Sequence, residues 1–354
     1  MSINQQEVFW IGGATNWGGE SAPGLRALTV SSATAPALSR PITVAPNPMF
    51  AAVTPNGGVV VSHEVEQGSL TLFTNGQDLY RGEPTSISTA KTGGADPTNV
   101  AVIEFPSGHS AVLSANYNGG SLSVNPLHED SVGGPSLVIE YSGSGPATAR
   151  QASSHPHQVV INQDSGEVLV PDLGADVVHV HRIEDLERGR SEHRNIRLPE
   201  GSGPRNLVVA DGCALVACEL DALVHVVSLE SGEPLTDASP ATPGDDAVQN
   251  LPSAIRITKT GHVLVGNRGP DTIGVLRWDG DAQSLMYHSE FLCGGAHPRD
   301  FQLNTAEDLV VVANLKSNDL AILGFDDQQG TLRLREKIPT GSPSCVVRQI
   351  FGSR

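Results

Sequence analysis

A proline that opens a short apolar strand recurs seven times along the chain, at intervals of 45 to 59 residues. Each opening is usually followed by a tight turn and a second apolar strand that ends in a polar residue. A fixed period in this range is typical of repeat proteins, and one small sheet per period is typical of a β-propeller. The openings are NPMFAAV from Asn47, DPTNVAVI from Asp96, HPHQVVI from His155, GPRNLVV from Gly203, LPSAIRI from Leu251, HPRDFQL from His297 and SPSCVV from Ser342. The period therefore predicts an all-β, seven-bladed propeller with four antiparallel strands in each blade.

The two ends of the chain complete one blade between them. The last opening, at Pro343, runs out of sequence after the single strand CVVRQIF. The amino terminus supplies three strands without an opening, EVFWIGG, LRALTV and LSRPITV. We therefore predict that the C-terminal strand is the innermost strand of the N-terminal blade, which closes the ring and removes exposed strand edges. Residues 1–354 would then form a single domain.

Charge and apolar patterning exclude several classes of partner. The formal net charge of −17 makes nucleic acids and anionic membranes poor partners, although a local pocket can still attract a small anion. No segment approaches the roughly 20 apolar residues that a membrane helix needs. The amino terminus has no basic region followed by an apolar core, so we expect a cytoplasmic protein. We also expect a monomer or a weak homodimer. The cysteines, which lack metal-like spacing, are expected to be buried thiols: Cys213, Cys218, Cys293 and Cys345.

The repeat also predicts which distant side chains meet. In a four-stranded blade, the start of the innermost strand and the end of the second strand lie on the same face. The residues directly after the opening prolines should form a ring around the channel mouth: Met49, Thr98, His157, Arg205, Ser253, Arg299 and Ser344. The second-strand ends should form another: Glu64, Asn116, Asp172, Glu219, Asn267 and Asn314, with Arg268 one step further. Asn and Asp are also ordinary turn formers, whereas burying arginines or a histidine without a function is costly. His155 is either a loop residue or part of the same mouth.

The ordered strings SHPHQVV, PDLGAD, GSGPRN, CEL, NRG, HPRDF and VVAN resemble those of the seven-bladed propeller lactonase family. That family includes the propeller type of 6-phosphogluconolactonase, and carboxymuconate-lactonising enzymes look similar. The resemblance covers almost the whole chain and implies an enzyme without metal or other cofactor that acts on a small anionic lactone. It places the active site on His157, Arg205, Glu219 and Arg268, with Arg299 close by and Arg150 in a matching pair with Gln151. The chain departs from the family at Asn206, and at Thr98 and Asn99, where the family usually carries Cys or His.

These residue types suit lactone hydrolysis. We expect His157 to be the general base, oriented or charge-balanced by Glu219, because histidine titrates near neutral pH. Arg205 and Arg268 would stabilise the oxyanion and Arg299 would hold a phosphate or carboxylate, since arginine stays cationic and forks onto such groups. Three alternatives stay open. They are a lactone-forming cycloisomerase, a non-catalytic binding platform, and a calcium-dependent lactonase with ligands at Glu64, Asn116, Asp172 and Asn314.

Overall fold

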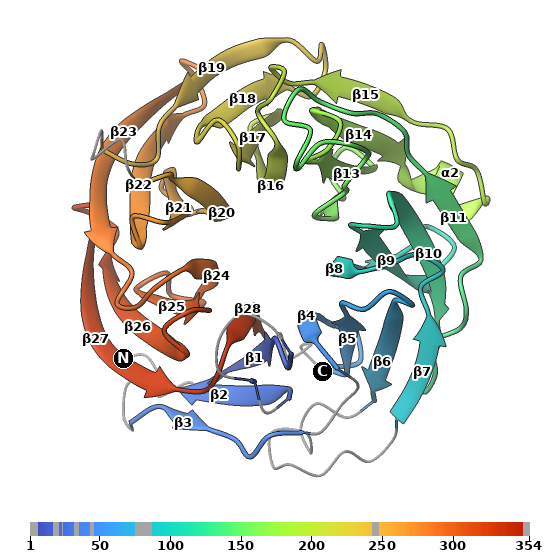
Figure 1. The fold of residues 1–354 in the computed structure, drawn as a ribbon, viewed down its shortest axis with the longest axis horizontal. Helices are drawn as coiled ribbons and strands as arrows, with labels where there is room; N and C mark the ends of the chain where they lie inside the picture. Colours follow the sequence, from blue (N-terminus) through green and yellow to red (C-terminus); the bar gives the residue numbers. More distant parts are fainter. Residues whose placement is uncertain are drawn as a thin grey trace.

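A computed structural model describes residues 6–16, 21–22, 24–31, 35–42, 46–74, 87–242 and 248–349. In these residues the chain forms antiparallel four-stranded sheets that stand in a ring around a central axis (Figure 1). There are seven such sheets among the described residues, and each corresponds to one predicted blade. The predicted seven-bladed propeller is therefore confirmed.

Blades two to four follow the sequence repeat, with each innermost strand beginning at or soon after an opening proline. Blade two contains β4 (Pro48–Val53), β5 (Val59–His63), β6 (Ser69–Phe73) and β7 (Ile87–Lys91). Blade three contains β8 (Pro97–Glu104), β9 (Ser110–Asn116), β10 (Ser121–Leu127) and β11 (Leu137–Glu140). Blade four contains β12 (Val160–Asn162), β13 (Glu167–Asp172), β14 (Val177–Arg182) and β15 (Arg194–Arg197). One short helix, α2 (Ile183–Glu187), leaves β14, and at five residues it is too short to show a helical period in sequence.

Blades five to seven repeat the same order from the channel outward. Blade five contains β16 (Pro204–Ala210), β17 (Cys213–Cys218), β18 (Val224–Ser228) and β19 (Pro234–Ala238). Blade six contains β20 (Leu251–Ile257), β21 (His262–Arg268), β22 (Thr272–Asp279) and β23 (Ser284–Leu292). Blade seven contains β24 (Pro298–Leu303), β25 (Leu309–Asn314), β26 (Asp319–Asp326) and β27 (Thr331–Pro339).

The first blade joins the two ends of the chain, as predicted. Its strands run outward in the order β28 (Pro343–Arg348), β1 (Glu7–Gly13), β2 (Arg26–Val30) and β3 (Ala37–Leu38). β28 pairs antiparallel with β1, with Phe9 opposite Arg348 and Gly12 opposite Cys345. The outermost strand differs from the prediction, because β3 covers only Ala37 and Leu38 and so shares one residue with the predicted strand LSRPITV.

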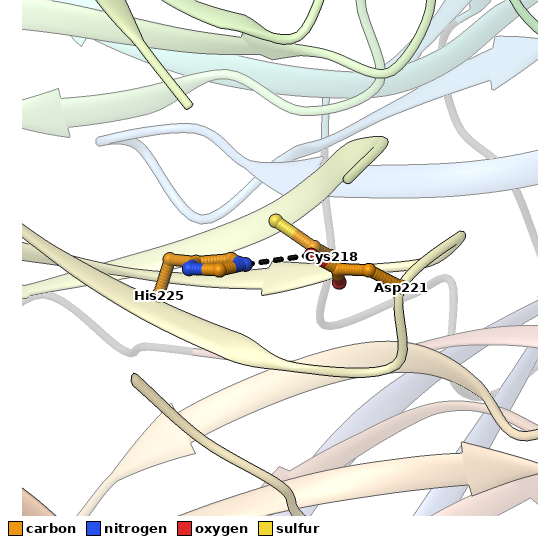
Figure 2. A group of neighbouring side chains, drawn as sticks. All are labelled: Cys218, Asp221 and His225. Atoms are coloured by element: carbon orange, nitrogen blue, oxygen red, sulfur yellow. Dashed lines mark hydrogen bonds and ion pairs between the residues drawn. The ribbon is translucent and has the colours of Figure 1, made fainter. Parts of the chain in front are cut away.

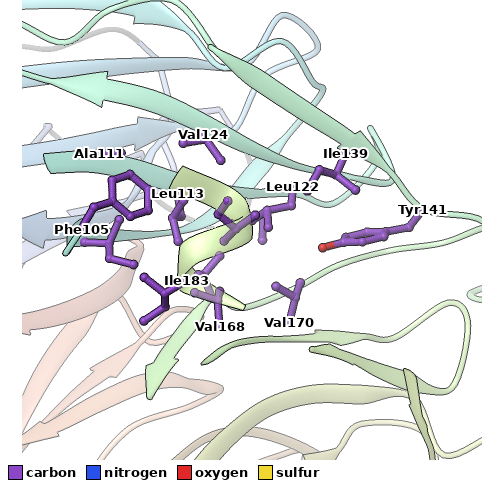
Figure 3. Close-up of a cluster of buried hydrophobic side chains, with 14 residues drawn as sticks. Phe105, Ala111, Leu113, Leu122, Val124, Ile139, Tyr141, Val168, Val170 and Ile183 are labelled. Carbon is purple, nitrogen blue, oxygen red and sulfur yellow. The ribbon is translucent and has the colours of Figure 1, made fainter. Parts of the chain in front are cut away.

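Apolar side chains fill the spaces between neighbouring blades. The cluster between blades three and four unites Leu113 and Leu122 with Val168 and Val170, and α2 adds Ile183 (Figure 3). Strands that face a neighbour on both sides are expected to be rich in Val, Ile and Leu, as this sequence is. All four cysteines are buried and free, as expected. No helix in the described residues is long and apolar enough to span a bilayer.

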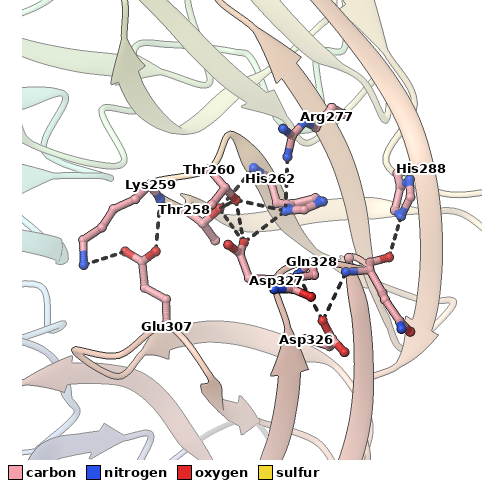
Figure 4. Close-up of polar contacts among 12 residues, drawn as sticks. Thr258, Lys259, Thr260, His262, Arg277, His288, Glu307, Asp326, Asp327 and Gln328 are labelled. Atoms are coloured by element: carbon pink, nitrogen blue, oxygen red, sulfur yellow. Dashed lines mark hydrogen bonds and ion pairs between the residues drawn. The ribbon is translucent and has the colours of Figure 1, made fainter.

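Polar contacts tie adjacent blades together on the face opposite the opening prolines. Asp327, in the turn that follows β26, accepts hydrogen bonds from Thr258 and Thr260, the latter at 2.6 Å, and lies 3.1 Å from His262 (Figure 4). Nearby, Glu307 accepts from the backbone nitrogen of Lys259 at 3.0 Å. These contacts join the turns of blades six and seven on that face.

A second set of contacts links the innermost strands around the channel. Ring hydroxyls donate to the ring of the next blade, from Thr98 to the His157 carbonyl at 3.1 Å and from Ser344 to the Met49 carbonyl at 2.8 Å. Ser253 does the same toward the Pro298 carbonyl at 2.6 Å. These hydroxyls fix the inner strands relative to one another.

Candidate active site

Irregular pairing at the opening prolines aims the ring side chains. In five blades the register shifts directly after the proline, so the next residue leaves the ladder: Met49, Thr98, Arg205, Ser253 and Arg299. A bulge of this kind re-aims a side chain without ending the strand. In blade four Pro156 bridges Asp172, and the His157 nitrogen donates to the Pro171 carbonyl at 2.9 Å. The bulges account for a ring of side chains that sequence alternation alone would not orient.

Glu219 is the centre of the polar cluster. Its side chain is only 3% exposed, and its Oε2 lies 2.6 Å from Arg268 Nη2 and 3.1 Å from Arg205 Nε. Its Oε1 lies 2.7 Å from Nη2 of Arg150. Burial alone would raise the pKa of Glu219, but the charges of Arg268, Arg205 and Arg150 lower it well below its usual value. The carboxylate is therefore ionised and shared among three guanidinium groups.

Asn206 also holds the guanidinium group of Arg205. Its Oδ1 accepts a hydrogen bond from Arg205 Nη1 at 2.6 Å. The equivalent residues of two other blades instead accept backbone bonds from the next blade, Asn99 from Val159 at 3.0 Å and Asp300 from Val346 at 2.9 Å. Asn206 is thus used to hold the arginine and not to join blades.

His157 borders the same group and is neutral at neutral pH. Burial lowers the pKa of His157 well below 6.5, and the charges of Arg205 and Arg299 lower it further, while Glu219 opposes them. Its Nδ1 is buried and has no hydrogen-bond partner. Glu219 was expected to orient or charge-balance His157; no hydrogen bond joins them through this nitrogen, and Glu219 acts on the histidine through its charge.

Tyr117 is a member of the cluster that the sequence did not suggest. Its ring stacks on His155 at a centroid distance of 4.5 Å and meets the His157 ring edge-on at 5.8 Å. Its hydroxyl accepts a bond from Arg150 Nη2 at 3.3 Å, and its carbonyl lies 3.0 Å from His155 Nδ1. Arg150, on the long connection 141–154, therefore reaches from blade three across to Glu219 of blade five.

Arg299 and Glu64 lie on the other side of the mouth. Arg299 Nη2 is 3.7 Å from Glu64 Oε2, and both side chains are mostly buried. Burial raises the pKa of Glu64, although the Arg299 charge opposes the shift. His297 also lies near these charges, although the sequence did not indicate it as a site residue. Burial and the charges of Arg268, Lys316 and Arg299 lower the pKa of His297 to about 3. A proton on His297 is thus disfavoured by neighbouring cations.

The second predicted ring is out of register by one residue at four positions. Asn116, Asp172, Asn267 and Asn314 pair with the opening prolines and direct their side chains into their own blades. Asn116 donates to Ser121 and Ser123, and Asn314 donates to Asp319. Because side chains alternate along a strand, the following residues face the mouth instead, as Tyr117 and Arg268 do.

Asp172 has a structural environment. It accepts hydrogen bonds from the backbone nitrogens of His155, Gly174 and Ala175, and from Ser154. Its Oδ2 also lies 3.1 Å from His179 Nε2. Asp172 and the two asparagines proposed as calcium ligands, Asn116 and Asn314, therefore hold contacts within separate blades and do not form a joint oxygen cage.

A small cavity lies beneath the ring, lined by His157, Arg205, Asn206, Arg299 and Asp300 among others. Its volume of about 20 Å³ is room for about one water molecule. A larger hollow of about 1330 Å³ lies at the opposite ends of the inner strands of blades four to six. We place the candidate site at the smaller cavity, because His157, Arg205 and Arg299 line it and interact with the other titratable groups described above.

The chain is similar to known proteins along nearly its full length. Residues 8–348 match the family described as "Lactonase, 7-bladed beta-propeller". It is 28% identical over 322 residues to a 6-phosphogluconolactonase of Bacillus subtilis, covering 88% of this chain and 90% of that protein. It is 26% identical over 317 residues to a 6-phosphogluconolactonase of Formosa agariphila, covering 84% and 87%.

A solved structure extends this similarity to three dimensions. The periplasmic gluconolactonase of Pseudomonas aeruginosa superimposes with a TM-score of 0.83 at 25% identity. The match covers 98% of this chain and 99% of that one. With a family match that spans residues 8–348, this chain belongs to the seven-bladed β-propeller lactonase family.

Proposed function

We propose that this protein hydrolyses a phosphorylated sugar-acid lactone, with 6-phosphogluconolactone as the first substrate to test. The observation that carries the proposal is the convergence of four arginines and the neutral His157 on a single mouth. The arginines are Arg150, Arg205, Arg268 and Arg299, and the nearby carboxylates are those of Glu64, Glu219 and Asp300, of which Asp300 is paired with Arg256. The names of the relatives supply the lactone class, and the surplus of positive charge supports an anionic substrate.

His157 is the proposed general base. A water attacks the lactone carbonyl carbon while His157 takes one of its protons. The tetrahedral intermediate then collapses, the bond from the carbonyl carbon to the ring oxygen breaks, and the protonated histidine returns its proton to that oxygen. The new carboxylic acid loses a proton to solvent, so turnover acidifies the medium. The buried, unpartnered Nδ1 of His157 is consistent with a nitrogen that is available to substrate or water.

Arg205 is the proposed oxyanion partner. It borders the same cavity as His157, and Asn206 and Glu219 fix its guanidinium group from two sides. Arg268 already donates to Leu251 and Pro252 carbonyls and to Glu219, so it acts chiefly through its charge. Arg299 and the partly exposed Arg150 are placed to meet the phosphate.

Proton release from a panel of phosphorylated and free sugar lactones tests the proposal against the spontaneous rate. We expect acceleration with 6-phosphogluconolactone and a loss of roughly 100- to 1000-fold in kcat for His157→Asn and for Arg205→Gln. His109→Gln, at an exposed turn residue, is the matched control and should keep wild-type turnover. Wild-type protein that hydrolyses no lactone faster than buffer, or two active-site variants with unchanged turnover, would refute the assignment.

The pH profile gives a second check. Because the pKa of His157 is held well below 6.5, the histidine is unprotonated across the neutral range. Activity should therefore be flat through neutrality and decline only as the pH falls below 6.5. A decline in kcat/KM centred above pH 6.5 would contradict the assignment of His157 as the base.

A further inference from the structure

A hairpin of blade five carries a second group of chemically reactive side chains. Cys218 ends β17, Asp221 lies in the following turn, and His225 lies in β18 (Figure 2). Their donor atoms, one from each residue, all lie within 4.8 Å of one another. In the part of the chain that the structure describes, no other three His, Cys, Asp or Glu residues converge in this way.

The group is separate from the candidate active site, although it is adjacent in sequence. Cys218 packs in the apolar layer between blades four and five, with Leu169 and Leu207. Glu219 follows Cys218 directly and faces the mouth, because successive strand residues point to opposite sides. None of the mechanism above uses Cys218, Asp221 or His225.

The contacts within the group leave two ligand atoms directed at each other. His225 Nε2 lies 2.6 Å from Asp221 Oδ2, while Asp221 Oδ1 is occupied by the Leu223 backbone nitrogen at 3.1 Å. The Asp221 side chain is 25% exposed, which provides a route from solvent. A cation at this point would take the place of the proton that now joins the imidazole and the carboxylate.

The surroundings of the group are acidic and therefore favour a cation. Asp221 and Asp176 lie near the Cys218 thiol. Asp237, on the neighbouring strand, pairs with His225 in the ladder and adds another acidic residue to this face. A divalent metal bound here would displace the thiol proton to solvent, since a coordinating thiol is deprotonated.

We propose that Cys218, Asp221 and His225 bind a zinc ion. Thiolate, imidazole and carboxylate are the ligand types that zinc prefers, and three protein ligands leave one tetrahedral position for water. The three residues lie within eight positions of one hairpin, so the fold forms the chelate locally. Because Cys218 and Asp221 flank Glu219 in sequence, an occupied site would also stiffen the backbone that carries this carboxylate.

Cobalt(II) is the probe, because a cobalt–thiolate bond gives a near-ultraviolet charge-transfer absorption that zinc lacks. We expect chelator-treated full-length protein to bind one equivalent of Co²⁺ with this absorption, and added Zn²⁺ to abolish it. Cys218→Ser should remove the band, whereas Cys213→Ser, at the other end of the same strand, should retain it. No saturable band at millimolar Co²⁺, or a band that survives Cys218→Ser, would overturn the proposal.

Asp221→Asn guards against a variant that simply fails to fold. It removes the ligand charge and keeps the acceptor for the Leu223 nitrogen. We expect it to keep the thiolate band but to weaken Co²⁺ binding on the order of 100-fold, while circular dichroism shows an intact sheet. Unchanged Co²⁺ affinity in a folded Asp221→Asn protein would exclude this residue as a ligand and would overturn the site as proposed.

Discussion

Removing the charge of Glu219 should destabilise the protein measurably. Glu219→Gln keeps the shape of the side chain but leaves Arg205 and Arg268, both at least 93% buried, without a counterion. Breaking a buried ion pair from one side costs about 3–5 kcal/mol. For 354 residues, an unfolding entropy of about 2.1 cal/mol/K per residue converts this cost to a fall in Tm of about 4–7 °C.

Differential scanning calorimetry with and without inorganic phosphate measures this effect. The variant mouth has one negative charge fewer, so phosphate should raise the Tm of Glu219→Gln more than that of the wild type. Glu184→Gln, which breaks an exposed ion pair of 3.2 Å with Arg188, is the control and should shift Tm by less than about 1 °C. A Glu219→Gln protein that melts like the control, with no larger response to phosphate, would refute the view of Glu219 as a shared counterion.

Three further predictions concern Asn206, His181 and the ring closure. Asn206→Ala removes the hydrogen-bond acceptor for Arg205 and should lower kcat about 10-fold, which is the loss expected for a charged hydrogen bond of about 1.5 kcal/mol. A kcat within twofold of the wild-type value would contradict the positioning role of Asn206. Burial lowers the pKa of His181 to about 3, so below pH 6.5 the unfolded chain binds a proton that the folded protein does not. The free energy of unfolding, measured by urea denaturation, should therefore fall from pH 6.5 toward pH 3 by up to about 1.4 kcal/mol per pH unit, and His181→Gln should flatten that slope. Truncation after Gly341 deletes β28 and should give unfolded or aggregated protein, so a truncated chain that melts like the parent would argue against closure by β28.

The fold was predictable because its information is repeated. Each unit contains an opening proline, a short apolar strand and a turn. Where the strands of one unit are ambiguous in sequence, the pattern shared by the other units indicates where they lie. The ring closure followed from counting, since one strand was missing at the amino terminus and one was left over after Pro343. The outermost strand of the first blade was less predictable, because β3 is two residues long and pairs with β2 only.

The site was only partly predictable because its side-chain directions depend on irregular pairing. His157, Arg205 and Arg299 follow an opening proline, so the repeat placed them in one ring. The side chains at the ends of the second strands were harder to predict, because the alternation of apolar and polar residues does not show which residue is the last to pair with the innermost strand. The sequence points to Asn116, whereas Tyr117 faces the mouth, because a turn-forming asparagine is more conspicuous in sequence than the aromatic residue after it. The pairing of each second strand with its opening proline is the signal that resolves this choice.

The Arg150–Glu219 contact suggests how a strongly acidic chain keeps a cationic site available. Four guanidinium groups near one another repel, and Glu219 offsets this repulsion while holding Arg205 and Arg268 in fixed positions. Arg150 differs because 42% of its side chain is exposed and it belongs to the long connection 141–154. Under the proposed function, we expect Arg150 to leave Glu219 for an incoming phosphate while the two buried arginines stay in place. Glu219 would then preorganise the interior of the site, and the exposed arginine would exchange its partner when an anion binds.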